Sequence, residues 1–123
     1  MKKQPLVVSL EKLGVDMTPP IEHTHCKFTS PSLMPLVIEK WPHNKDWYYM
    51  SVANYGEQAG DLMCDPDIMF MVVDGKLYPY SYQNDYLGIY NMCEGRPTMQ
   101  RDILSFCNTW ARQIREARYT LAE

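Results

Sequence analysis

Glycine is scarce in this 123-residue chain, and several common site motifs are missing. The six glycines are dispersed and form neither a phosphate-cradling loop nor the G-x-G-x-x-G fingerprint of dinucleotide-binding folds. There is no G-x-S-x-G nucleophile elbow. The four cysteines include no C-x-x-C pair, which removes the usual zinc and redox motifs. We therefore expect free thiols and no cofactor.

Long apolar runs are also lacking. No stretch approaches the roughly 20 apolar residues of a membrane span. The N-terminal apolar run is interrupted by Glu11 and Lys12, so it is too short for the core of a signal peptide. We expect a cytoplasmic protein that does not associate with membranes.

The chain has no overall excess of basic charge. Its formal net charge is −3, and between Val52 and Glu94 the only basic residue is Lys76. Nucleic-acid-binding proteins usually carry a basic surplus that tracks phosphates. The overall charge therefore predicts no nucleic-acid partner.

The composition is that of a globular protein, with 46% hydrophobic and 22% charged residues. This length suits one domain spanning residues 1–123. Leu6, Val7, Leu10 and Leu13 recur at helical spacing, which predicts a short N-terminal helix. Pro5 suits its first position, and Gly14 suits its C-terminal end.

Four segments favour strands. Residues 33–41 and 47–55 are rich in β-branched and aromatic side chains, although a helix is the alternative for 33–41. Residues 67–74 and 76–83 flank Asp74-Gly75, the strongest short-range signal for a hairpin. Both faces of the 67–74 arm are apolar, which predicts that both are covered. Pro79 predicts an edge or a bulge in the second arm, and residues 23–28 favour a further short strand or an extended loop.

The C-terminal segment has the clearest helical periodicity. Ile103, Phe106, Trp110 and Ile114 recur every three to four residues, and Thr98 suits the N-cap. We expect this helix to pack on one face of the sheet with Trp110 near the centre of the contact. The predicted fold class is α+β: an antiparallel β-meander of about four strands, with a short N-terminal and a long C-terminal helix.

An acidic segment offers the first candidate site. It contains Glu57, Asp61, Asp65 and Asp67, and Asp85 follows the hairpin. Carboxylates brought together could hold a divalent cation or divide acid and base roles. The alternative is turn chemistry, because aspartates in Gly-Asp and Asp-Pro steps commonly bond to nearby backbone N–H groups.

His23 and His25 form the second candidate. In an extended segment they share a face and could hold a metal together with one further ligand. No second ligand pair with a recognisable spacing follows, so we predict no metal site and treat these residues as weak candidates.

Tyrosine supplies the third candidate. Tyr78, Tyr80 and Tyr82 alternate along one predicted strand and should share a face, and Trp41 and Trp47 in other segments add to the aromatic content. They could pack beneath the helix with their hydroxyls at the rim, form a protein-binding face, or stack single-stranded bases.

Several motifs resemble a bacterial and phage domain of unknown function that is often encoded on conjugative and other mobile elements. They are Gly60-Asp61, Asp65-Pro66-Asp67, Tyr78-Pro79, the run from Tyr82 to Tyr86 (YQNDY), and the upstream run from Met34 to Glu39 (MPLVIE). The resemblance spans roughly residues 27–90. It implies an accessory gene product of a mobile element and no particular reaction.

These observations favour a non-enzymatic interaction protein whose hairpin and acidic loop bind a protein partner. The binding residues would be Glu57, Asp61, Asp65, Asp67, Tyr78, Tyr80, Tyr82 and Asp85. The alternative is a small carboxylate- or metal-dependent enzyme that uses the Asp61–Asp67 loop and Asp85. The arm at residues 76–83, as an exposed edge strand, could also pair two copies into a homodimer.

Overall fold

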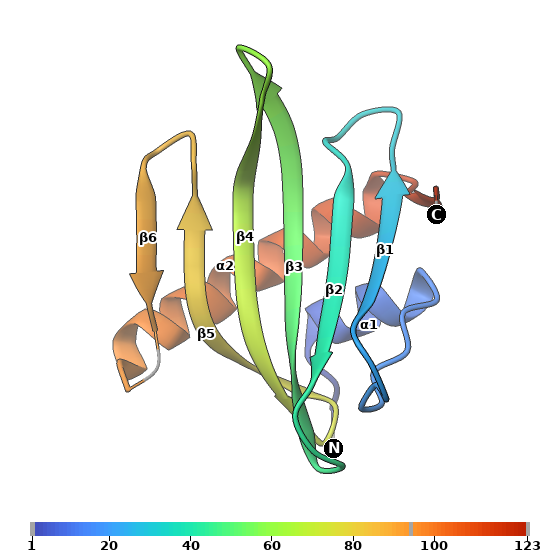
Figure 1. Cartoon of the computed structure of the whole chain (residues 1–123), viewed down its shortest axis with the longest axis vertical. Helices are drawn as coiled ribbons and strands as arrows, with labels where there is room; N and C mark the ends of the chain where they lie inside the picture. The colour runs from blue at the N-terminus through green and yellow to red at the C-terminus, as the bar shows by residue number, and fades with distance from the viewer. Residues whose placement is uncertain (1, 94, 123) are drawn as a thin grey trace.

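The computed structural model describes residues 2–93 and 95–122. It contains one antiparallel sheet with two helices on the same face (Figure 1). Its elements are α1 (Pro5–Lys12), β1 (Thr24–Thr29), β2 (Leu36–Pro42), β3 (Trp47–Gln58), β4 (Asp61–Val73), β5 (Lys76–Asn84), β6 (Ile89–Met92), α2 (Pro97–Glu116) and β7 (Thr120–Leu121). The predicted α+β class is confirmed.

The sheet is a meander of consecutive hairpins in the order β6-β5-β4-β3-β2-β1-β7. It has seven strands, more than the four expected. Residues of β1 are predicted as either a strand or an extended loop, and the sequence does not predict β6 and β7. Those two strands have only four and two residues, too few for alternation to be recognised. β7 follows α2 and pairs with the outer side of β1.

The Asp74-Gly75 hairpin is confirmed. Both turn residues have positive φ, 52° and 73°, as a two-residue hairpin turn requires. Ala59 and Gly60 form an equivalent turn between β3 and β4, with φ of 53° and 87°. The prediction of an acidic loop at Asp61–Asp67 is therefore wrong, because this segment is the first half of β4.

β5 is not a full edge strand. β6 pairs with its second half, from Ser81 to Asn84, and no described strand pairs with the first half on that side, where the Gln4 side chain hydrogen-bonds both backbone groups of Leu77. Pro79 lies at a register shift between β4 and β5, where the chain inserts one extra residue, Tyr80. The predicted bulge is confirmed, and the edge prediction holds for residues 76–80 alone.

The helices form as the apolar spacing predicts. α1 has Pro5 at its start and buries Leu6, Val7 and Leu10. α2 also begins with a proline, at Pro97, so Thr98 lies inside the helix and is not its N-cap. Neither described helix is long and apolar enough to span a membrane.

Trp110 lies at the centre of the contact between helix and sheet, as predicted. Its side chain is 2% exposed, and it packs in a core with Phe70, Met50 and Ile114. Its indole N–H donates a hydrogen bond of 2.7 Å to the Asn54 side chain on β3. The main apolar core, to which Trp110 belongs, lies between the sheet and its helical layer.

Candidate binding face

The other side of the sheet, which we call the open face, has no helical layer among the described residues (Figure 1). Alternation along the strands shows that its members include His25, Lys27, Val37, Glu39, Trp41, Trp47, Tyr49, Ser51, Asp67, Met69, Met71, Val73, Tyr78 and Tyr80. The prediction that both faces are covered is therefore wrong. Along β4, Ile68, Phe70 and Val72 are buried, whereas the alternate Met69, Met71 and Val73 are only partly buried.

One end of the open face is aromatic. The Trp47 indole stacks on His43 at 3.9 Å between ring centroids and contacts Tyr49 edge-on at 5.1 Å. Tyr49 in turn contacts Tyr80 at 5.4 Å. Three adjoining strands thus supply one continuous surface, because Tyr49 on β3 is paired with Met71 on β4, which is paired with Tyr78 on β5.

A carboxylate lies on the same face. The Asp67 side chain accepts hydrogen bonds from Ser51 Oγ at 2.6 Å and from the Tyr55 hydroxyl at 3.3 Å. Partial burial raises the pKa of the Asp67 carboxyl above its ordinary value, and the nearby Glu39 adds to this shift. The two hydrogen bonds oppose the shift without cancelling it.

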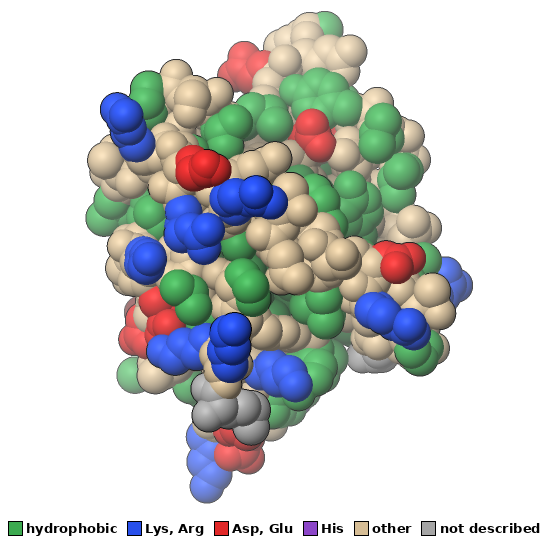
Figure 2. Space-filling view, turned by 180° about the vertical axis from the view of Figure 1, so that it is seen from behind, with side chains coloured by type: hydrophobic (Ala, Val, Ile, Leu, Met, Phe, Trp, Pro, Cys, Tyr) green, Lys and Arg blue, Asp and Glu red, His purple; other side chains and the backbone are tan. Residues whose placement is uncertain are grey.

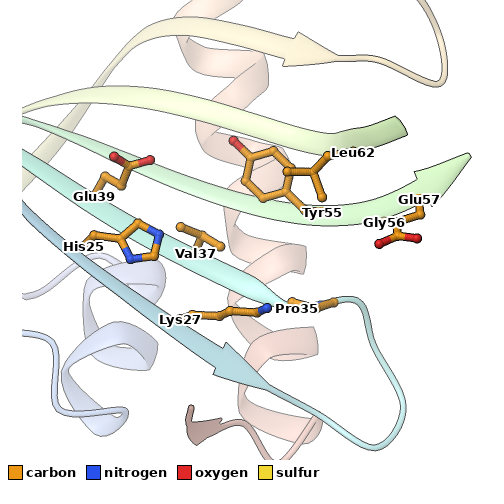
Figure 3. A pocket seen from close by; sticks show the side chains of 9 residues that line it. All are labelled: His25, Lys27, Pro35, Val37, Glu39, Tyr55, Gly56, Glu57 and Leu62. Carbon is orange, nitrogen blue, oxygen red and sulfur yellow. The ribbon is translucent and has the colours of Figure 1, made fainter. Parts of the chain in front are cut away.

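Next to this carboxylate, the surface forms a hollow of about 590 Å³ between β1, β2 and the β3–β4 hairpin (Figure 3). Val37, Tyr55 and Leu62 supply its apolar wall, and His25 and Glu39 lie at one end. Desolvation raises the pKa of the Tyr55 hydroxyl, so this group stays protonated and donates its one proton to Asp67.

The predicted acidic residues are not brought together. Glu57 and Asp61 are exposed at opposite sides of the β3–β4 turn. Asp65 accepts a hydrogen bond of 2.6 Å from the Asn84 side chain. Asp67 is the one member whose carboxylate lies on the open face beside other polar groups.

Asp85 has a local structural role. Its carboxylate accepts the backbone N–H of Cys64 at 2.9 Å and the Gln83 side-chain amide at 2.8 Å. These bonds hold the pKa of the Asp85 carboxyl below its ordinary value. Asp85 thus fastens the end of β5 to β4, which is the turn chemistry considered as the alternative for this residue.

The three tyrosines of β5 do not share one face. Because Tyr80 is the extra residue of the bulge, Tyr78 and Tyr80 both lie on the open face. Tyr82 is paired with Ile68 and packs against the core on the helical side. The predicted grouping of all three is wrong, since simple alternation does not reveal a bulge.

The two histidines occupy different surroundings. The His23 imidazole stacks on Trp41 and contacts the Glu39 carboxylate at 2.8 Å, whereas His25 lines the hollow. Across residues 2–93 and 95–122, no group of three or more His, Cys, Asp or Glu side chains is arranged to hold a metal ion.

Sequence reasoning missed the contributions of Ser51, Met69 and Met71 to this face. The alternation of β4 predicts that Met69 and Met71 share a face, but apolar side chains on both faces of a strand also favour a second covering layer, which the described residues do not form. Nothing in the sequence points to Ser51, because its role depends on the register of β3 against β4.

Residues 10–120 match the family model of a domain of unknown function, DUF6908. The chain belongs to this family. No curated protein and no solved structure matches it significantly. The family assignment covers almost the whole sheet and both ends of α2, and it carries no reaction with it.

Proposed function

We propose that this protein is a non-enzymatic accessory protein, encoded on a mobile element, whose open face binds another protein. The observation that carries the proposal is the composition of that face. An antiparallel sheet with one solvated side normally places polar side chains there. Here the outward positions of β3 and β4 hold Trp47, Tyr49, Met69 and Met71.

These residue types fit a protein partner. Tryptophan, tyrosine and methionine are enriched at protein interfaces, where aromatic rings bury a large area and methionine adapts to irregular shapes. The aromatic rings already contact one another in the order His43, Trp47, Tyr49 and Tyr80. The partner would therefore meet a preordered surface, which lowers the entropic cost of association.

The arrangement of the carboxylates supports binding over catalysis. An enzyme that uses paired acids needs two carboxyl groups converging on one reacting position. Asp65 is engaged by Asn84, Asp67 by Ser51 and Asp85 by Cys64. Because each carboxylate is hydrogen-bonded to a different partner, structural roles are favoured for Asp65 and Asp85.

Affinity capture from the host, after nuclease treatment, tests the proposal. A tagged Trp47→Ala, Tyr80→Ala double variant removes the two rings that flank Tyr49 in the aromatic surface. The matched control is Phe106→Ala, because Phe106 is an aromatic residue on α2 that is 38% exposed. We expect one protein to be recovered in stoichiometric amount with the wild type and the control, and to be lost with the double variant.

Two results would contradict the proposal. The first is equal recovery of the same protein with the double variant, provided that circular dichroism shows the variant to be folded. The second is recovery of the protein itself as the sole specific prey. That outcome favours a homodimer, for which the first half of β5 is the candidate edge once the Gln4 side chain is displaced from Leu77.

A further inference from the structure

The fold separates charges that balance in the sequence. The two segments that contain the helices, residues 2–12 and 96–118, carry eight Lys or Arg and three Asp or Glu. Residues 13–93, which form most of the sheet, carry four basic and ten acidic side chains. The two segments that contain the helices thus have a surplus of five positive charges, whereas residues 13–93 have a surplus of six negative charges. The net charge of −3 hides this division.

The outward side of α2 carries a polar stripe that is rich in arginine and is bordered by the exposed Glu116 at its C-terminal end. Positions seven, eleven and fourteen residues apart lie close to one line on a helix of 3.6 residues per turn. Arg101, Asn108, Arg112 and Arg115 have this spacing, with Ser105 beside them, and all are exposed. At 1.5 Å per residue the stripe is about 21 Å long. It presents donors of hydrogen bonds along most of the helix.

Helix stability does not account for this pattern. Cations are favourable at the C-terminal end of a helix and unfavourable at its N-terminal end. Arg115 lies in the last turn of α2, but Arg101 lies near its start. Lys2 and Lys3 precede α1, and neither helix has an acidic residue in its first turn. Within the described part of the chain, Lys3 with Glu11 is the one ion pair of this layer.

Both helices contribute to one surface. The Ser9 hydroxyl of α1 donates a buried hydrogen bond of 2.8 Å to the carbonyl of Ala111 on α2. This contact places α1 against the C-terminal half of α2, near Arg112. Figure 2 views the molecule from this side and shows lysine and arginine side chains spread over the face.

We propose that this basic helical face binds the phosphodiester backbone of a nucleic-acid duplex. Guanidinium groups form paired hydrogen bonds with phosphate oxygens, and serine and asparagine side chains commonly donate to them. A membrane surface fits less well, because a helix that lies in a bilayer needs an apolar side free for insertion. The apolar side of α2, with Ile103, Trp110 and Ile114, is buried in the core.

This proposal revises the expectation, drawn from the overall charge, that the protein has no nucleic-acid partner. It does not depend on the protein partner proposed for the open face. The two surfaces lie on opposite sides of the molecule, so both can be occupied together. Contacts to phosphates carry no sequence information by themselves. The binding is therefore sequence-independent and salt-dependent.

Fluorescence anisotropy with a labelled DNA duplex of about 20 base pairs tests the proposal on the full-length chain. We expect dissociation constants on the order of 1–100 µM at physiological salt, and tighter binding at low salt. The affinity should fall with salt at a logarithmic slope of roughly −3, as for three or four phosphate contacts. An RNA duplex bound as tightly would support the same backbone chemistry.

The variant Arg112→Gln, Arg115→Gln removes two of these contacts. The affinity of this variant for the duplex at low salt should fall at least tenfold. The slope of its logarithmic affinity against logarithmic salt concentration should become less negative by about 2. The control Lys45→Gln, Lys76→Gln changes the net charge equally with exposed residues outside the helical layer, and it should bind like the wild type. Thermal unfolding confirms that both variants are folded.

Three outcomes would overturn the proposal. One is no change of anisotropy at 25 mM salt. Another is an equal loss of affinity in the control variant, which would indicate an effect of net charge alone. The third is binding to phosphatidylserine vesicles without binding to either duplex, which would assign the face to a membrane.

Discussion

Trp110 on α2 donates its indole N–H to the side-chain oxygen of Asn54 on β3, at 2.7 Å, inside the core. The Asn54 side-chain N–H in turn donates a hydrogen bond of 3.0 Å to the Tyr119 hydroxyl oxygen. A polar contact thus fixes the position of the helix on a sheet that it otherwise meets through apolar packing. Buried polar pairs of this kind stabilise the fold only while both partners are present.

Two substitutions at Trp110 separate packing from hydrogen bonding. Trp110→Ala should lower the free energy of unfolding by about 3–5 kcal/mol, because it leaves a cavity. Trp110→Phe keeps a ring but leaves the Asn54 oxygen without this donor, at a cost of about 1–3 kcal/mol. Urea unfolding followed by circular dichroism measures both. A loss below about 1 kcal/mol for Trp110→Ala would refute the central position of this residue.

The Asp67 carboxyl makes stability depend on pH in a defined direction. Its pKa in the folded protein lies above the ordinary value of 3.8, so the folded state keeps the proton to higher pH than the unfolded chain does. The free energy of unfolding should therefore fall as the pH rises from about 3.8 through the raised pKa. Asp67→Asn removes the ionisation and should abolish this fall. Unfolding curves from pH 3 to pH 7 that keep the same fall in the variant would contradict the assignment.

Asp85 should change the pH dependence of stability in the opposite direction. Its pKa is below 3.8 in the folded protein, because the ionised form accepts hydrogen bonds from Cys64 and Gln83. The stability it contributes is fully present above pH 3.8 and is lost as the pH falls through the lowered pKa. Asp85→Asn should therefore lower the melting temperature more at pH 7 than near pH 2. An equal loss at both pH values would indicate a role that does not depend on ionisation.

The sequence predicts the parts of this fold that depend on local signals. Periodicity identifies both helices, and Asp74-Gly75 identifies the central hairpin, because both turn residues need positive φ. β6 and β7 are too short to show alternation. The turn at Ala59-Gly60 was missed because alanine is an unusual residue at positive φ.

The candidate site was harder to predict, since it depends on register. The acidic segment seemed to be a loop because it contains Asp65-Pro66, yet it pairs with β3 over its first four residues. The extra residue at Tyr80 moves Tyr82 to the helical side. Of the eight predicted binding residues, the structure gathers Asp67, Tyr78 and Tyr80 on one face, and their neighbours there come from other strands.

Site-specific photo-crosslinking in the host tests the central claim, protein binding by the open face, most directly. A photoreactive phenylalanine analogue would replace Tyr78 on the open face or, as control, Phe106 on α2; these side chains are 42% and 38% exposed. We predict a discrete protein adduct from position 78 and none of the same mass from position 106. No adduct from position 78, or the same adduct from both positions, would contradict the account.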